Sequence, residues 1–336
     1  MNKTLWAERR VLVTGAGGFK GSHLVDALVQ GGANVVSLVR DFDPRSYFET
    51  QGLGRKSTVV TGDLKDYRKI ADILSKYEIT DIFHLGAQPI EGTAFLNPLE
   101  TLETNIMGTV HVLEAARQYS NVTGIVAVSS DKAYGPCDNM PIVETERLQG
   151  QTPYDVSKSC ADLIAQVYAN PRVYGMPITV ARCANVFGPG DLNMNRIVPG
   201  TLEAIITRQP LRIRSNGKLV REYIYVKDVV EGYIQLAENI ESTRGEAFNL
   251  AGGTVLSVTE IVEKICGILG QSIEINILKE APGEVPEQHL TGSKIREVIG
   301  WEARTDFAAA VRETYDWYSK ILTDRPLDVN SHAEEE

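Results

Sequence analysis

The stretch VLVTGAGGFKG, residues 11–21, decides the fold of this chain. It opens with three apolar residues, as a short buried strand does, and passes through glycines into a segment, 22–30, with apolar residues at helical spacing. Glycines permit a tight turn between strand and helix, and they leave backbone amides uncovered where the helix begins. The stretch therefore predicts a strand, a turn that can bind a phosphate group, and a helix.

The same alternation continues along the first 180 residues. Further strands are expected at 35–39, 57–60, 81–85, 124–129 and 178–181, and helices at 66–76, 102–119 and 154–168. Strands that alternate with helices form right-handed βαβ units and a parallel sheet covered on both faces. The predicted class is therefore α/β, with a Rossmann-type doubly wound parallel sheet that binds a nucleotide over residues 1–180.

The pattern changes after residue 180. Glycine, proline and asparagine break the chain into short elements near 188–190, 199–200 and 215–217. We expect a smaller α+β substrate-binding domain over 181–222 and 251–325, while residues from about 223 to 250 can return to the first domain. Residues 326–336 are mostly polar and are expected to form a frayed tail.

The composition is that of an ordinary globular protein with an acidic balance. Its 336 residues are 43% hydrophobic and 23% charged, and the formal net charge is −10. Nucleic acids and anionic membranes attract basic faces, so neither is expected as a partner. No segment reaches the ~20 apolar residues of a membrane span, and the start lacks a signal-like apolar run, which favours a cytoplasmic protein. The four cysteines are scattered without metal-ligand spacing, so no metal site is expected.

The end of the second expected strand bears on the choice of cofactor. A glycine turn between strand and helix, with Asp63 and Leu64 after the third strand, favours a dinucleotide. An acid at the end of the second strand would bind the ribose 2′-hydroxyl of NAD, whereas a basic residue can hold the 2′-phosphate of NADP. Val39 stands where the acid is expected and Arg40 follows it, which favours NADP. NAD remains open through Asp41, and Arg40 can also be a solvated charge at a strand end.

Two segments carry acid–base chemistry. Tyr154 and Lys158 are four residues apart in an expected helix, so the phenol and the ammonium share one face. A nearby cation can lower the pKa of a phenol until it accepts a proton near neutral pH. The segment 129–132, SSDK, adds two hydroxyls, a carboxyl and an amine. A hydride transfer alone does not need so many acid–base groups, which indicates a second chemical step.

The motifs in combination resemble one family. They are the glycine loop, Asp63-Leu64, the run HLGAQ at 84–88, Asn105, Ser129-Ser130, Tyr154 with Lys158, and the run RCANVFGP at 182–189. Between about Arg10 and Trp301 they resemble the extended short-chain dehydrogenase/reductase family that acts on nucleotide sugars. Residues 18–21, 87–89, 130–132 and 221–228 are most similar to CDP-glucose 4,6-dehydratases and their relatives.

The resemblance implies a tightly bound and regenerated NADP or NAD. The residues that it assigns to the cofactor are Gly15, Gly17, Gly18, Phe19, Lys20, Gly21, Arg40, Asp63, Leu64, Leu85, Gly86, Ala87, Gln88, Asn105, Ser129, Tyr154 and Lys158. It also implies a homodimer, in which the helices expected at 102–119 and 154–168 form a four-helix interface. Their apolar faces are also what any helix covering a sheet presents.

The resemblance further implies a 4,6-dehydratase. Tyr154, acidified by Lys158, takes the proton of the sugar C4 hydroxyl while hydride passes to the cofactor, and Ser129 or Ser130 binds the same oxygen. Asp131 as acid and Lys132 as base, or the two as a coupled pair, then eliminate water across C5 and C6. Hydride returns to C6 and leaves a 4-keto-6-deoxy sugar.

One departure from the family concerns the base. The dTDP-glucose dehydratases carry Thr-Asp-Glu where this chain has Ser130-Asp131-Lys132, so the base would be an amine. A lysine must be desolvated, or lie near another positive charge, to be neutral near pH 7. Lys132 can instead be a structural ion-pair partner.

The substrate side is assigned by the same resemblance. Asn185 corresponds to an asparagine that binds the diphosphate or the sugar, and Arg221 to an arginine that holds the diphosphate. Weaker candidates around the nucleotide, each of which can equally be a surface charge, are Arg196, Arg212 and His289. Nearer the sugar, the candidates are Gln88, Ser130 and Tyr134; Tyr134 either lines the pocket or packs under the loop.

Two alternatives stay open. A nucleotide-sugar 4-epimerase or reductase on the same scaffold needs Ser130, Tyr154 and Lys158 but not the pair Asp131 and Lys132. A protein that senses a dinucleotide without catalysis would need the glycine loop but has no use for an acidified phenol.

Overall fold

The computed structural model describes residues 1–280 and 285–323. The expected tail, 326–336, and the last two residues assigned to the second domain, 324–325, lie outside the described residues. Among the described residues, no helix has both the length and the apolar character needed to cross a membrane.

Seven parallel strands form the main sheet, in the order β10-β6-β5-β4-β1-β2-β3. They are β1 (Arg10–Thr14), β2 (Asn34–Val39), β3 (Thr58–Thr61), β4 (Asp81–His84), β5 (Gly124–Val128), β6 (Ile178–Cys183) and β10 (Ala247–Leu250). The order runs in opposite directions from β1 and from β4, so the switch point lies between these strands, where open α/β sheets bind ligands. The predicted doubly wound α/β class is confirmed.

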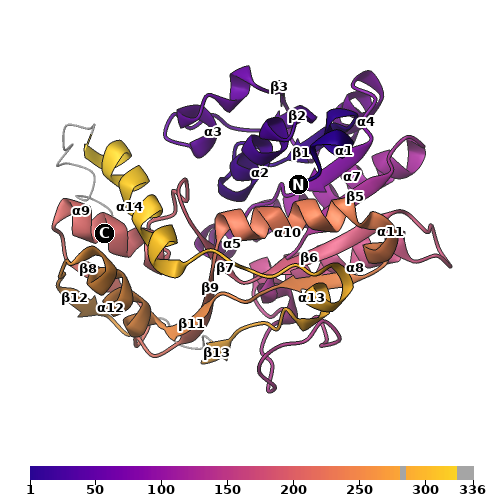
Figure 1. The fold of residues 1–336 in the computed structure, drawn as a ribbon. Coiled ribbons are helices and arrows are strands. Elements are labelled where there is room, and N and C mark those ends of the chain that lie inside the picture. The colour runs from indigo at the N-terminus through magenta and orange to yellow at the C-terminus, as the bar shows by residue number, and fades with distance from the viewer. Residues whose placement is uncertain (281–284, 324–336) are drawn as a thin grey trace.

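Helices cover both faces of this sheet (Figure 1). On one face lie α2 (Phe19–Gln30) and α10 (Val226–Glu238), and on the other α4 (Tyr67–Lys76), α7 (Gly108–Gln118) and α8 (Pro153–Ala169). Successive strand residues alternate between the two cores: Val11 and Val13 pack with α2, while Leu12 packs with α4 and α7. The apolar strand of the opening stretch is therefore buried on both sides.

The helix expected at 102–119 is interrupted. The structure has α6 (Pro98–Leu102), a π-helical turn (Glu103–Met107) and then α7. Such π-turns often occur at functional sites because they redirect one side chain. Here the turn contains Asn105, which faces the loop after β4.

The second part of the chain builds a smaller mixed sheet. Strand β9 (Val220–Tyr225) pairs in parallel with β7 (Asn185–Phe187) and β13 (Glu287–Gln288), and antiparallel with β11 (Thr254–Ser257). Residues 223–225 therefore differ from our expectation that the chain rejoins the first sheet at about 223. It returns to the face of that sheet with α10 and to the sheet itself with β10.

The other elements are short or lie toward the C-terminus. Figure 1 shows α9 (Ile197–Thr207), α12 (Val258–Leu269) and α14 (Phe307–Thr323) gathered near β8 (Leu211–Ile213) and β12 (Ile275–Ile277). The remaining helices are α1 (Lys3–Ala7), α3 (Tyr47–Thr50), α5 (Glu91–Leu96), α11 (Ile240–Thr243) and α13 (Ser293–Ile299), with single 3₁₀ turns at Leu53–Arg55 and Asp131–Tyr134.

Candidate active site

The glycine loop is packed too closely for side chains. Gly15 has φ +68°, and a Cβ on Gly15 would lie 2.8 Å from the Cα of Gly86. A Cβ on Gly21 would lie 2.1 Å from the carbonyl oxygen of Gly15. Gly18 precedes α2 without a side-chain cap, so the first amides of the helix remain available to an anion. The loop therefore fits a pyrophosphate.

Two basic residues flank this loop. Lys20, in the first turn of α2, reaches across to β6 and donates from Nζ to the Sγ of Cys183 at 3.5 Å. Arg40 follows β2, donates to Asp41 at 2.6 Å and lies 3.7 Å from Glu100. The guanidinium of Arg40 is thus shared between two carboxylates.

The remaining cofactor candidates line the same edge of the sheet. Gly17 and Phe19 belong to the glycine loop, and Leu85, Gly86 and Ala87 follow β4. After β3, Asp63 accepts from the backbone amide of Lys65 at 2.8 Å, and Leu64 is buried against Gly86 and Gly108. Together these residues surround the carboxyl ends of β1, β2 and β4.

Gln88 and Asn105 have a different role from the one expected. The side chain of Gln88 bonds Ile90 through both its nitrogen and its oxygen, and it also donates to Thr101. Asn105 bonds both backbone groups of Gln88 and donates to Ser157 on α8. Both are buried, so their polar atoms hold the loop after β4 in place instead of facing a ligand.

The turn after β5 carries unsatisfied polar atoms. Ser130 caps a 3₁₀ turn, accepting from the amide of Lys132 and donating to Oδ1 of Asp131 at 2.9 Å. Ser129 Oγ and Asp131 Oδ2 are buried and have no hydrogen-bond partner among the described residues. Burial raises the pKa of Asp131, while Lys132 and Ser130 oppose the rise. A buried carboxyl with a raised pKa is suited to act as an acid.

Lys132 is the second residue of this 3₁₀ turn. Its Nζ is 3.6 Å from Oε1 of Glu91, the first residue of α5. The Lys132 side chain is 25% exposed and that of Glu91 52% exposed. The ion pair connects the turn after β5 with α5, which agrees with the alternative that Lys132 is an ion-pair partner; its partner, Glu91, was not predicted.

Tyr154 and Lys158 share one face of α8, but their electrostatics differ from our expectation. Burial raises the pKa of Tyr154, and the largest opposing charge is Arg196 instead of Lys158. The Nζ of Lys158 donates to the carbonyl of Val128 at 3.0 Å. Burial and the charge of Lys20 lower the pKa of Lys158 to about 8.

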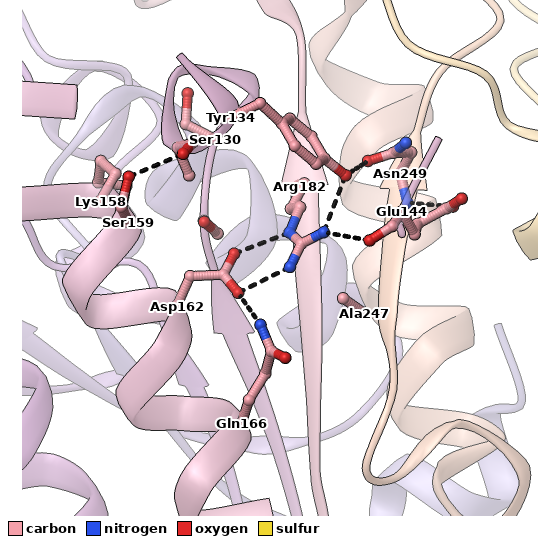
Figure 2. Close-up of polar contacts among 12 residues, drawn as sticks. Ser130, Tyr134, Glu144, Lys158, Ser159, Asp162, Gln166, Arg182, Ala247 and Asn249 are labelled. Atoms are coloured by element: carbon pink, nitrogen blue, oxygen red, sulfur yellow. Dashed lines mark hydrogen bonds and ion pairs between the residues drawn. The ribbon is translucent and has the colours of Figure 1, made fainter. Parts of the chain in front are cut away.

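A buried polar network lies behind the turn. Figure 2 shows Arg182 at its centre, in a two-bond ion pair with Asp162 at 2.8 and 2.9 Å. Arg182 also donates to the hydroxyl of Tyr134 at 2.9 Å, and this hydroxyl donates to Asn249 at 2.7 Å. Of the two alternatives for Tyr134, lining the sugar pocket or packing under the loop, the structure favours the second, because the side chain is fully buried and its hydroxyl is bonded inside the protein.

Two of the substrate candidates lie on the second sheet, and a third lies at the start of α9. Arg221 on β9 is buried and helps to lower the pKa of Asp131, which places its charge near that carboxyl. Asn185 on β7 donates to the carbonyl of Glu222 on β9. Arg196 begins α9, pairs with Asp191 at 2.9 Å and acts on the phenol of Tyr154.

The two weakest candidates are placed differently. Arg212 is exposed on β8, in a two-stranded sheet separate from the one that holds Arg221. His289 lies within 3.0 Å of Glu287, and its backbone carbonyl accepts from the amide of Ile142.

Other residues at the site escaped the sequence analysis. Gln288 on β13 is buried, donates to the backbone carbonyl of Asp131 at 3.0 Å, and keeps its Oε1 without a partner among the described residues. Cys183 contacts the hydroxyl of Tyr233 at 3.1 Å beside Lys20. Glu91 stands three residues after Gln88. A polar residue beside a recognised motif is a weak signal, since burial and pairing are not visible in sequence.

The arrangement can transfer protons at two positions. A phenol and an ammonium lie on one helix, and a hydroxyl, a buried acid and an ion pair lie on the adjacent turn, all at the edge where the sheet binds ligands. The glycine loop at the same edge suits a dinucleotide.

Known proteins are similar to this chain in sequence and in fold. A family model for GDP-mannose 4,6 dehydratase matches residues 12–314. The CDP-glucose 4,6-dehydratase of Salmonella typhimurium is 30% identical, over 99% of this chain and 97% of that protein.

Solved structures of related enzymes have a similar fold. A UDP-glucose 4-epimerase from Thermotoga maritima has a TM-score of 0.85 at 28% identity, covering 93% of this chain and 99% of that one. The dTDP-glucose 4,6-dehydratase DesIV from Streptomyces venezuelae, solved with NAD, has a TM-score of 0.83 at 26% identity, covering 93% and 97%. The match of the family model over most of the chain identifies the protein as a member of the GDP-mannose 4,6-dehydratase family, within the extended short-chain dehydrogenases/reductases.

Proposed function

We propose that the protein is a nucleotide-sugar 4,6-dehydratase. The observation that carries the proposal is the buried carboxyl of Asp131, whose Oδ2 has no hydrogen-bond partner among the described residues, beside Ser130 and across from the helix that holds Tyr154 and Lys158. Oxidation and reduction alone would not need an acid at this place. The similarity to CDP-glucose and dTDP-glucose 4,6-dehydratases supports the same reaction.

The residues divide the work as follows. Burial raises the pKa of Tyr154, and the positive charge of a bound oxidised nicotinamide would lower it again. Tyr154 then accepts the proton of the sugar C4 hydroxyl, Ser130 bonds the same oxygen, and Lys158 would orient the phenol and the cofactor ribose. A nicotinamide dinucleotide held by the glycine loop would take the hydride from C4 and return it to C6. Asp131, whose pKa is raised by burial, donates its proton to the C6 hydroxyl, which leaves as water. Lys132 and its partner Glu91 remain as candidates for the base that removes the C5 proton.

The choice between NADP and NAD depends on Arg40. The sequence favoured NADP, but Arg40 is already engaged by Asp41 and lies near Glu100, and both carboxylates would repel a 2′-phosphate. We therefore propose NAD, with Asp41 near the ribose. Titration of the purified protein with each cofactor tests this: tighter binding of NADP, lost in Arg40→Ala, would reverse the choice.

The nucleotide end of the substrate is assigned to the second sheet. We propose that Arg221 holds the diphosphate, with Asn185 and Arg196 beside it, because a guanidinium can bond two phosphate oxygens at once. Replacing Arg221 with Lys keeps the charge but loses this planar geometry. The Michaelis constant for the nucleotide sugar should then rise, with a smaller effect on turnover.

Product mass tests the reaction itself. The enzyme with cofactor is incubated with a panel of nucleoside-diphosphate glucose, mannose and N-acetylglucosamine, and the products are weighed by mass spectrometry. Loss of one water with a new ketone supports the dehydratase. A product of unchanged mass would favour the 4-epimerase, which the similarity to the Thermotoga maritima epimerase keeps as second candidate.

We also propose a homodimer through the segments 102–119 and 154–168, which form the π-turn with α7 and most of α8. The large apolar side chains exposed on these segments and on the preceding α6 are Leu99, Met107, Val156, Leu163 and Val167. Exposed apolar side chains on neighbouring helices are typical of an interface. Light scattering should give a dimer and Leu163→Glu a monomer; a monomeric wild-type protein contradicts the proposal. The cytoplasmic location remains a prediction from sequence.

A further inference from the structure

The elimination needs a group that can accept the C5 proton. The sequence offers Lys132, but its ammonium forms an ion pair with Glu91 at 3.6 Å. A charged ammonium has no lone pair with which to accept a proton. The carboxylate of the same pair does, and carboxylates are common bases for protons next to a ketone.

The backbone that leads into Glu91 is held in place. It directly follows Ile90, whose amide and carbonyl are both bonded by the side chain of Gln88. Gln88 is in turn bonded through its backbone to Asn105, which donates to Ser157 on α8. The buried cluster of Gln88 and Asn105 thus connects Glu91 to the helix that carries Tyr154.

The electrostatics agree with this placement. The negative charge of Glu91 helps to raise the pKa of Tyr154 and of Asp155, so the carboxylate lies within range of the catalytic phenol. The side chain of Glu91 is half exposed, so it can move toward a bound sugar without leaving a packed core.

We propose that Glu91 is the catalytic base of the elimination and that Lys132 is a positioning residue that orients it. This proposal rests on the proposed dehydratase function. The turn after β5 has Lys132 where the dTDP-glucose dehydratases have a glutamate, and α5, which follows the loop after β4, supplies the carboxylate of Glu91 instead.

The step balances in protons and electrons. Glu91 takes the proton from C5 of the 4-keto sugar, and the electron pair of the broken C–H bond forms the C5–C6 double bond. The C6–O bond breaks, and the oxygen leaves as water with the proton of Asp131. When hydride returns to C6, the electron pair of the double bond takes the proton back from Glu91 at C5. The proton that Tyr154 took from the C4 hydroxyl restores Asp131, so the net loss is one water.

Glu91→Gln tests the proposal directly. Its rate of water loss should fall about 10²- to 10⁴-fold, the usual contribution of a general base. Oxidation at C4 should continue, so enzyme-bound NADH should accumulate and be seen by its absorbance. Incorporation of deuterium at C5 from heavy water should slow in parallel.

A lysine base predicts the opposite effect of Glu91→Gln on turnover. If Lys132 were the base, loss of its carboxylate partner would make its neutral form easier to reach, and Glu91→Gln would turn over as fast as wild type or faster. That result would overturn the proposal. The matched control is Glu302→Gln, because Glu302 is 51% exposed and paired with Arg304, and it should behave as wild type.

Variants of Lys132 test the positioning role. Lys132→Met should reduce turnover by roughly tenfold, less than Glu91→Gln, and Lys132→Arg should recover most of it, because an arginine can keep the ion pair. A loss with Lys132→Met as large as that with Glu91→Gln, not recovered by arginine, would contradict the proposal. The proposed function is tested separately from the role of Glu91: it is wrong if the wild-type enzyme releases water from none of the sugars in the panel.

Discussion

The buried network around Arg182 and the turn at 129–132 lie next to each other, but the hydrogen bonding of their buried polar atoms differs. In the network, Arg182 and Asp162 form a two-bond ion pair, and Tyr134 and Asn249 complete it (Figure 2). In the turn, Ser129 and Asp131 each keep a buried oxygen without a partner among the described residues. A satisfied buried network stabilises one structure, whereas unsatisfied buried atoms are retained where a ligand completes them.

The two regions are also physically joined. Tyr134 ends the 3₁₀ turn that begins at Asp131, and Asp162 lies one helical turn beyond Lys158 on α8. Ser159 donates to the carbonyl of Ala133 at 2.7 Å between them. The network therefore fixes the scaffold against which the reactive side chains are held, and substitutions in each region should have opposite effects on stability.

The largest effect is expected from Arg182→Met. It leaves Asp162 buried without its cation, so the free energy of unfolding should fall by about 3–5 kcal/mol. Denaturant unfolding measures the loss. Arg304→Met is the control, because Arg304 is 74% exposed, and it should stay within about 0.5 kcal/mol of wild type. Equal effects of the two would contradict the structural role of the network.

Lys158→Met should act in the other direction. The native pKa of Lys158 is lowered to about 8, so its buried charge destabilises the folded state at neutral pH. The ligand-free variant should gain roughly 2–3 kcal/mol of stability while losing turnover. Exposed Lys76→Met should change neither.

The pH dependence sharpens this prediction. Above pH 8 the native state of wild type releases the Lys158 proton while the unfolded state still binds it, so wild-type stability rises from about pH 8 toward 10.4. The advantage of Lys158→Met should therefore shrink over this window in thermal melts. An advantage that stays constant up to pH 10 would contradict it.

Asp131→Asn should also raise the stability of the ligand-free protein at neutral pH. The raised native pKa of Asp131 means that its carboxylate destabilises the fold above that pKa, and this penalty disappears as pH falls and the group is protonated. The melting temperature of the variant should exceed that of wild type at pH 8 and converge with it below about pH 4. Catalysis should be lost, because an amide cannot donate the proton of an acid.

Ser159→Ala has the smallest expected effect. Loss of one buried hydrogen bond to the turn should reduce stability by about 1 kcal/mol. Because this bond holds the turn and not the phenol, water loss should slow more than C4 oxidation, and bound NADH should rise during turnover. Stopped-flow absorbance measures this; slowing of both steps by the same factor would show that the bond does not position the turn specifically.

Much of the fold follows from local pattern. The alternation of strands and helices through β6 and the glycine turn were readable because they depend on nearest neighbours in the chain. The return of residues 247–250 to the first domain was expected, and the pairing of β10 with β6 agrees with it. The position of β9 in the second sheet was not readable, because only pairing with distant strands assigns this short strand to a sheet.

The sequence alone determined the class of fold, the place of the glycine loop, and the chemical groups available for catalysis. The tertiary structure decided which of these groups are free to react. The side chains of Gln88, Asn105 and Tyr134 form hydrogen bonds inside the protein. Glu91 on α5 and Gln288 on β13 lie beside the turn. The physical reason is that burial and hydrogen-bond partnership are properties of packed elements far apart in the chain, and no spacing of residues along a sequence contains them.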